Sequence, residues 1–165
     1  MDKLSKRINL AVNLAIVVVA VLIGVVFARN YLLSARSPNQ SRDFRVAAGT
    51  KVTLPDVDWE NNQRTLLLVL STNCSYCTAS ASFYQQIAQN SKVQLVAVLP
   101  QVVAESKQYL SDLNVPIGEV KQSELPTLGV KGTPTLILVN SKGEVIRSWA
   151  GKLPPEEEKE VISSL

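Results

Sequence analysis

A continuous apolar stretch that leads directly into the only two cysteines constrains the fold of this chain more than any other feature. The stretch "TLLLVLS" covers residues 65–71, and Cys74 and Cys77 follow at once. An uninterrupted apolar run of this length is typical of a strand buried on both faces. Residues 75–90, which come next, have the apolar spacing of a helix. The sequence therefore predicts a strand, C-x-x-C, helix unit with Cys74 at the turn between the two elements.

The rest of the chain after this unit continues to alternate between strands and helices. A strand, helix, strand connection requires parallel strands, whereas Ser141–Gly143 has the composition of a hairpin turn between antiparallel strands. The fold class is therefore α/β, with a central mixed β-sheet flanked by helices on both faces. We expect strands at 51–55, 65–71, 93–100, 133–140 and 144–151, and helices at 75–90, 103–113 and 154–165.

The N-terminus contains 21 residues without a charge, from Ile8 to Ala28. At about 1.5 Å per residue a helix of this length spans roughly 30 Å, the thickness of a bilayer core. A cleaved signal peptide is the alternative, because the start is basic and residues 26–28 resemble a cleavage site, but the apolar run is longer than usual for one. We expect a transmembrane anchor at 1–29, a polar linker at 30–45 and a folded domain at 46–165.

The distribution of charge and the absence of histidine exclude several functions. Residues 1–29 carry four basic side chains and one acidic one, whereas residues 30–165 carry 13 basic and 13 acidic side chains. The folded part therefore has no basic bias, and we expect no binding of nucleic acid. The chain has no histidine. This excludes Ser-His and Cys-His nucleophilic sites and metal binding by histidine.

The cysteine pair has the spacing of a redox centre. A cysteine at the start of a helix faces free backbone N–H groups and the positive end of the helix dipole, and both stabilise its thiolate. Cys74 is therefore expected to be the attacking thiol and Cys77 the resolving one. A zinc site would need two more ligands, for which no histidine or further cysteine exists. A purely structural disulfide is possible, but so short a loop removes little unfolded-state entropy.

A second feature is the segment "VKGTPTLIL", residues 130–138, in which Pro134 precedes an apolar strand. Proline cannot donate to a strand ladder, so it is common at the first residue of a strand. The alternative is a cis Thr133–Pro134 bond, an uncommon conformation that is usually retained for a reason. The residues alone leave both interpretations open.

Together these segments resemble a known family. From about residue 49 to the end, the chain is similar to thioredoxin-fold proteins, on the strength of "TLLLVLSTNCSYC" and "GVKGTPTLILVNSKGEVIRSWAG". With the N-terminal anchor and the extra strand and helix between residues 93 and 113, it resembles the membrane-tethered TlpA-like thiol–disulfide oxidoreductases. The resemblance implies that Cys74 is the nucleophile, that Cys77 resolves the mixed disulfide, and that Pro134 is cis and packs beside them.

The same resemblance implies a client site, a location and partners. The backbone of Thr133 is expected to pair with an extended client segment, and Tyr76 and Pro134 are expected to contact it. No cofactor and no metal are implied. The expected partners are protein disulfides or dithiols of membrane or envelope proteins, reached by a single-pass protein whose C-terminal domain faces the periplasm. The competing hypothesis is a redox-silent binding module that holds a client.

The chain also departs from the family pattern. Asn73 stands where the family usually has a tryptophan, and Ser75-Tyr76 resembles the dipeptide of glutaredoxins, which are smaller and untethered. A peroxiredoxin would carry a proline and a threonine a few residues before Cys74, and both are absent. The family often places a buried acid below the resolving cysteine, but residues 66–70 are all apolar. Glu119 and Glu124 are the candidates to replace it.

Overall fold

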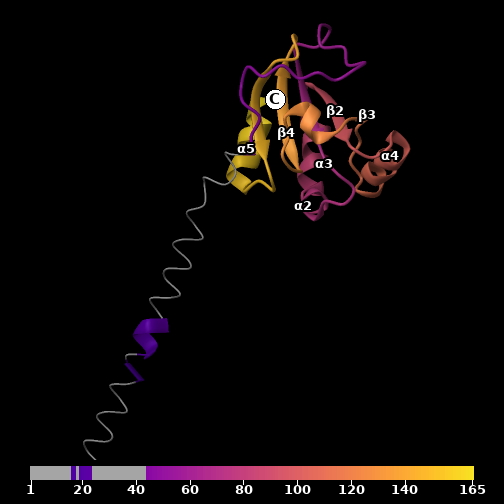
Figure 1. Ribbon diagram of the computed structural model, residues 1–165. Coiled ribbons are helices and arrows are strands. Elements are labelled where there is room, and N and C mark those ends of the chain that lie inside the picture. The colour runs from indigo at the N-terminus through magenta and orange to yellow at the C-terminus, as the bar shows by residue number, and fades with distance from the viewer. Residues whose placement is uncertain (1–15, 18, 24–43) are drawn as a thin grey trace, which may run out of the picture. The chain divides into compact units, whose positions relative to one another are not determined.

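The computed structural model describes residues 16–17, 19–23 and 44–165 of the chain (Figure 1). The chain divides into two units, residues 1–39 and 40–165. The described residues between 16 and 23 are helical and exposed. Among all described residues, none of the helices has both the length and the apolar character needed to span a bilayer. Most of the predicted anchor (1–29) and linker (30–45) lies outside the described residues, so both stay predictions.

A five-stranded mixed sheet forms the centre of the second unit. Parallel pairing joins β1 to β2 and β2 to β3, and antiparallel pairing joins β1 to β4 and β4 to β5. The predicted mixed sheet is confirmed. In spatial order the strands are β3 (Glu119–Gln122), β2 (Gln94–Leu99), β1 (Arg64–Val69), β4 (Thr135–Asn140) and β5 (Val145–Ala150).

This strand order brings distant loops together. The carboxyl ends of the parallel strands β1, β2 and β3 lie at the same end of the sheet as the beginning of β4. We call this the site end of the sheet, formed by residues 70–74, 100–102 and 129–134. The other end, where β1 and β2 begin, is the far end. The only two cysteines and the Pro134 segment therefore meet at the site end, as the resemblance implied.

The sheet is buried on both faces, which explains the uninterrupted apolar run of β1. Leu66, Leu68 and Leu70 belong to one hydrophobic cluster, and Leu67 and Val69 belong to a second one on the opposite face. All of these residues are fully buried. The first cluster includes residues of α3 (Ala81–Asn90), α4 (Val103–Asp112) and α5 (Pro155–Ser164).

The second face of the sheet is covered differently. Its cluster contains Leu128 from the 3-10 helix η1 (Leu125–Leu128) and Val46, Val52, Leu54 and Val57 from the non-helical segment before β1. The expected helices therefore flank the sheet, but on the second face the helical contribution is a single short 3-10 helix. The α-helices that contribute to a cluster all do so on the face of α3.

The predicted helix over 75–90 was wrong in one respect, because it is two helices. The first, α2, covers Ser75–Ala79, and α3 begins at Ala81. Ser80 between them has φ −104° and ψ 9°, and its N–H donates to the Cys77 carbonyl oxygen. A serine can adopt such a non-helical conformation readily because its side chain competes with the helix for backbone hydrogen bonds. The cysteines therefore lie on a single-turn helix.

Two further expectations differ from the structure. The predicted strand at 51–55 is reduced to an isolated bridge between Lys51 and Glu144, because only the residues around 49–52 pair with the β4–β5 hairpin before Pro55 and Asp56 enter a turn. The loop expected between residues 113 and 133 contains β3 and η1. Only one residue of β3, Val120, is buried. A single apolar residue does not make a pattern long enough to indicate a strand.

Candidate redox site

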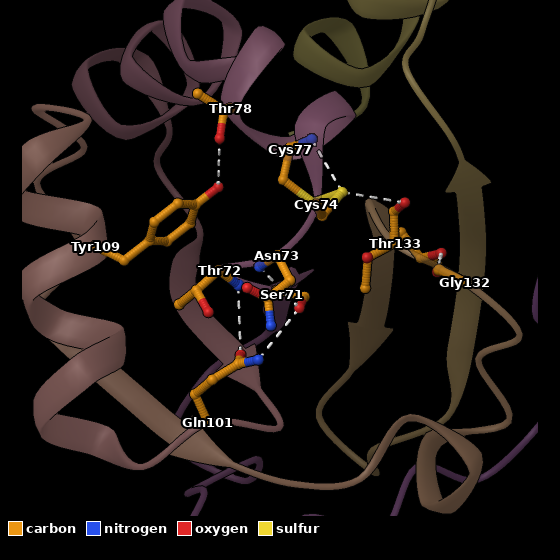
Figure 2. The surroundings of a disulfide bond; sticks show 11 residues. Ser71, Thr72, Asn73, Cys74, Cys77, Thr78, Gln101, Tyr109, Gly132 and Thr133 are labelled. Carbon is orange, nitrogen blue, oxygen red and sulfur yellow. Dashed lines mark hydrogen bonds between the residues drawn. A yellow bond between two sulfur atoms is a disulfide. The ribbon is translucent and has the colours of Figure 1, made fainter.

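The two cysteines form a disulfide at the start of α2 (Figure 2). Their Cα atoms are 5.2 Å apart, within the usual range for a disulfide. Cys74 is the N-cap residue of α2 and is partly buried, whereas Cys77 is fully buried. An incoming thiol or disulfide can therefore reach Cys74 more readily than Cys77. This asymmetry agrees with the predicted roles, which remain a prediction.

Backbone geometry gives the Cys74 sulfur a hydrogen-bond donor. The N–H of Cys77 lies 3.0 Å from Cys74 Sγ. In the reduced protein this N–H would stabilise the Cys74 thiolate more than the thiol, because a charged acceptor forms the stronger hydrogen bond. Since α2 is only one turn long, its dipole contributes less than the dipole of the long helix expected from the sequence. The direct N–H contact is the main stabilising feature.

The Pro134 segment lies against the cysteine pair. The Thr133–Pro134 peptide bond is cis, which confirms one of the two alternatives left open by the sequence. The Thr133 carbonyl oxygen is 3.3 Å from Cys74 Sγ (Figure 2). Pro134 is buried. Neighbouring groups are satisfied within the domain: Thr135 Oγ1 donates to the Gly132 carbonyl oxygen at 2.7 Å, and the Gly151 N–H donates to the Pro134 carbonyl oxygen at 2.8 Å.

Thr133 itself has an open backbone. Within the described part of the chain, neither its N–H nor its carbonyl oxygen pairs with another backbone group. It is also only partly buried. An open N–H and C=O at the beginning of a strand are the groups with which an extended peptide pairs in β-augmentation. Tyr76, the other predicted client contact, is 61% exposed on α2.

Sequence reasoning missed a group of polar residues that hold the loop before Cys74. The side chain of Gln101 accepts the Thr72 N–H at 3.4 Å and donates to Ser71 Oγ at 3.3 Å (Figure 2). In the first turn of α4, the Glu105 carboxylate accepts from Thr72 Oγ1 at 3.1 Å. The signal was available in principle, because Gln101 follows β2 and the ends of adjacent parallel strands lie side by side.

A contact on the other side of the disulfide completes this group. The hydroxyl groups of Thr78 and Tyr109 are 3.2 Å apart, which joins the end of α2 to α4 (Figure 2). Helix α4 therefore contacts the chain both before Cys74 and after Cys77. We call Gln101, which lies just before α4, together with Glu105 and Tyr109 of α4 the α4 brace.

The proposed replacements for a buried acid do not meet the cysteines in the described structure. Glu119 accepts from Gln94 Nε2 at 2.5 Å and lies 3.6 Å from Lys121 Nζ. Because Gln94 pairs with Thr65 at the beginning of β1, this places Glu119 at the far end of the sheet. Glu124 is exposed. The hypothesis that Glu119 is the buried acid was therefore wrong.

The first hydrophobic cluster, which contains Cys77, also contains the buried side chain of Tyr84. The hydroxyl group of Tyr84 does not act as a base. Burial raises the pKa of Tyr84 well above its usual range, so the phenol stays protonated. Among residues 44–165, no three metal-ligating carboxylates or cysteines converge on one point. The site therefore consists of the cysteine pair, the Thr133–Pro134 segment and the α4 brace.

The comparisons with known proteins agree with this fold. Residues 59–164 match the family model of the thioredoxin-like domain, and the chain belongs to that family. Its fold together with the C-x-x-C pair is that of a thiol–disulfide oxidoreductase. Comparison with curated proteins gave no significant sequence match.

Several solved structures share the fold. A protein from Chlorobium tepidum, assigned as the thiol:disulfide interchange protein DsbE, is 23% identical with a TM-score of 0.56, over 72% of this chain and 94% of that one. The thioredoxin domain of a thiol-disulfide oxidoreductase from Bacteroides vulgatus is 13% identical with a TM-score of 0.55, over 72% and 97% of the two chains. The exposed lipoprotein thioredoxin Etrx1 of Streptococcus pneumoniae is 20% identical with a TM-score of 0.51, over 66% and 88%.

Proposed function

We propose that this protein is a membrane-tethered thiol–disulfide oxidoreductase that exchanges disulfides with proteins of the cell envelope. The observation that carries the proposal is the position of Cys74. Cys74 is partly exposed, and its sulfur receives the Cys77 N–H at 3.0 Å and lies 3.3 Å from the Thr133 carbonyl oxygen. A nucleophile, a resolving thiol and a client-pairing edge therefore meet within one site.

The reaction proceeds through two exchanges when the protein acts on an oxidised client. The Cys74 thiolate attacks one sulfur of the client disulfide, which forms a mixed disulfide and releases the other client sulfur as a thiolate. The Cys77 thiolate then attacks Cys74 Sγ, which forms the Cys74–Cys77 disulfide and releases the second client thiolate. The client gains two electrons and the protein loses two. The reverse sequence oxidises a client dithiol.

The client is expected to bind as an extended segment. Its backbone pairs with the N–H and carbonyl oxygen of Thr133, which places a client sulfur next to Cys74. Buried Pro134 has no N–H, so it does not extend the ladder beyond this point. Tyr76 contributes an exposed aromatic surface on the other side of Cys74.

The location follows from the sequence of the N-terminus. The uncharged segment from Ile8 to Ala28 has the length of a bilayer-spanning helix. Disulfides form and persist mainly outside the cytoplasm, so an exchange enzyme for protein disulfides has its clients there. We therefore place residues 46–165 on the periplasmic or extracytoplasmic side, joined by the linker at 30–45 to the anchor at 1–29.

Trapping of clients in living cells tests the proposal. The full chain is expressed as the Cys77→Ser variant, which can attack a client disulfide but cannot resolve the mixed disulfide. We expect envelope proteins to be captured through Cys74 and released by dithiothreitol. The double variant with Cys74→Ser is the matched control. Equal capture by both variants, or capture only of cytoplasmic proteins, would contradict the proposal.

Protease treatment of spheroplasts tests the location separately. We expect external protease to digest residues 46–165 while the protein remains in the membrane fraction. A domain that is protected until the membrane is dissolved would reverse the proposed orientation. A soluble form that begins near Arg29 would show that the N-terminal segment is cleaved.

A further inference from the structure

The first described residues of the folded unit, Phe44–Val46, are attached firmly to the domain. Val46 is buried in the second hydrophobic cluster, and its carbonyl oxygen accepts from Ser148 Oγ at 2.8 Å. Arg45 forms an ion pair with Glu157 of α5, with 2.9 Å between Nη2 and Oε2. These contacts hold the backbone that directly follows Phe44. The position of Phe44 is therefore set by the fold.

Phe44 lies against the segment that leads to Thr133. A β-carbon at Gly132 would be 3.7 Å from Cδ1 and 3.9 Å from Cε1 of Phe44, so the ring lies on the side of Gly132 toward which a side chain would point. In the same way, a β-carbon at Gly129 would be 3.9 Å from Val46 Cγ1. The segment Phe44–Val46 therefore runs alongside residues 129–132.

Phe44 keeps a large apolar surface in solvent in spite of these contacts. Phe44 is 42% exposed. It lies beside Gly132, the residue that directly precedes Thr133 and its open backbone. A groove of about 670 Å³ lies on the same loop and is lined by Pro100, Glu124, Leu125, Pro126 and residues 129–131. An extended client that pairs with Thr133 and continues along Gly132 can come within reach of the exposed Phe44 ring.

We propose that Phe44 is a client-binding residue that selects extended protein segments with an apolar side chain close to the reacting cysteine. Side chains of an extended strand alternate between faces, so a residue one or two positions from the client cysteine can contact the ring. Burial of an apolar side chain against Phe44 strengthens binding of such clients over small disulfides. This inference rests on the proposed function and names the class of substrate.

A peptide series tests the proposal with the reduced full-length protein in detergent. Each peptide has one cysteine, held as a mixed disulfide with a small thiol, and carries leucine or serine at each position next to the cysteine. Oxidised glutathione is the small substrate without a peptide neighbour of this kind. We expect the unchanged protein to react about tenfold faster with the best leucine peptide than with its serine counterpart.

The variants separate recognition from structure. We expect Phe44→Ala to reduce the leucine preference to below about twofold, Phe44→Leu to retain part of it, and both to react with oxidised glutathione at the unchanged rate. Ile146→Ala is the matched control, because Ile146 is 43% exposed on β5 and is not part of the site. It should keep the full preference.

Three results would overturn the inference. The first is a leucine preference that survives Phe44→Ala. The second is an equal loss of rate of the Phe44→Ala variant with peptides and with glutathione, which would show that Phe44 only supports the loop. The third is a protein that exchanges disulfides but has no leucine preference. A protein that exchanges with neither substrate would instead contradict the proposed function itself.

Discussion

The two ends of the central sheet are built differently. At the far end, Arg64 Nη1 donates to the carbonyl oxygen of Ser164 at 2.8 Å, which joins β1 to α5. Gln94 donates to Glu119, which joins β2 to β3. Both contacts involve a charged group. At the site end, neutral amide and hydroxyl groups join the loops, such as Gln101 with Ser71, together with one charge-assisted contact from Thr72 Oγ1 to the Glu105 carboxylate. Exposed Tyr76 and the open backbone of Thr133 also lie there.

This difference separates stability from reactivity within one sheet. At the far end, the side chains of Arg64 and Glu119 form hydrogen bonds with other groups of the domain. At the site end, the N–H and carbonyl oxygen of Thr133 have no backbone partner among the described residues, and Tyr76 exposes an apolar surface. A charge placed beside Cys74 would shift the pKa of its thiol, whereas the neutral groups of Gln101 hold the loop without doing so. Changes at the two ends should therefore affect different measurements.

The largest expected effect is the loss of exchange on removal of the nucleophile at the site end. Cys74→Ser should reduce the catalysis of insulin reduction by dithiothreitol to the uncatalysed rate, because a serine hydroxyl cannot attack a disulfide at neutral pH. Thermal unfolding of the variant, compared with that of the reduced protein, should show little change. Retention of more than a small part of the activity would place the nucleophile elsewhere.

A smaller effect separates the two cysteines themselves. In the reduced protein we expect iodoacetamide to modify Cys74 at least about tenfold faster than Cys77 at neutral pH, because Cys74 is partly exposed and receives an N–H donor while Cys77 is buried. Mass spectrometry of the adducts measures the rate at each cysteine. Faster modification of Cys77 would reverse the assigned roles.

The α4 brace should have a modest effect on reactivity. Gln101→Ala removes one acceptor and one donor from the loop before Cys74, and we expect the rate of exchange to fall about threefold with a loss of stability of about 0.5–1.5 kcal/mol. Gln108→Ala is the control on α4, since the side chain of Gln108 donates locally, to Asp112 Oδ1. Equal effects of the two variants on the exchange rate would show that the brace does not position the loop.

The smallest effect on reactivity is expected at the far end. Arg64→Ala removes the bonds to Ser164 and Leu165 and should lower the free energy of unfolding by less than about 1 kcal/mol, because Arg64 is exposed. The rate of alkylation of Cys74 should not change. A changed rate would show that the two ends are coupled through β1, and the comparison between them would then fail.

The sequence predicted the features that depend on apolar pattern and on local chemistry. The buried strand before Cys74 and the hairpin at Ser141–Gly143 were found because each has a strong local signal. The residues alone left the isomer of the Thr133–Pro134 bond open, and only the family resemblance implied the cis form. The break at Ser80 and the strand β3 were missed, since a single serine is tolerated in helices and β3 has only one buried residue. The pairing of Gln101 with Ser71 depends on strand order, which no local pattern reveals.

Glu119 shows the same limit for the site. As a lone carboxylate in a predicted loop it could be placed near the cysteines, but its strand runs parallel to β2 and begins at the far end. Only the register, which pairs Glu119 with Val96, decides this. The spacing of the motif therefore identifies the reacting groups, Cys74 and Cys77. The sheet topology decides which other polar residues can reach them.

The central claim is that the Cys74–Cys77 pair is a reversible redox couple, and its reduction potential tests this most directly. The full-length protein is equilibrated with mixtures of reduced and oxidised glutathione or dithiothreitol, and the fraction of disulfide is measured by thiol labelling. We predict full cycling with a midpoint between about −270 mV, the value of thioredoxin, and about −120 mV, the value of the oxidant DsbA. A pair that stays oxidised well below about −300 mV would be a structural disulfide. That result would contradict the oxidoreductase and favour the redox-silent binding module.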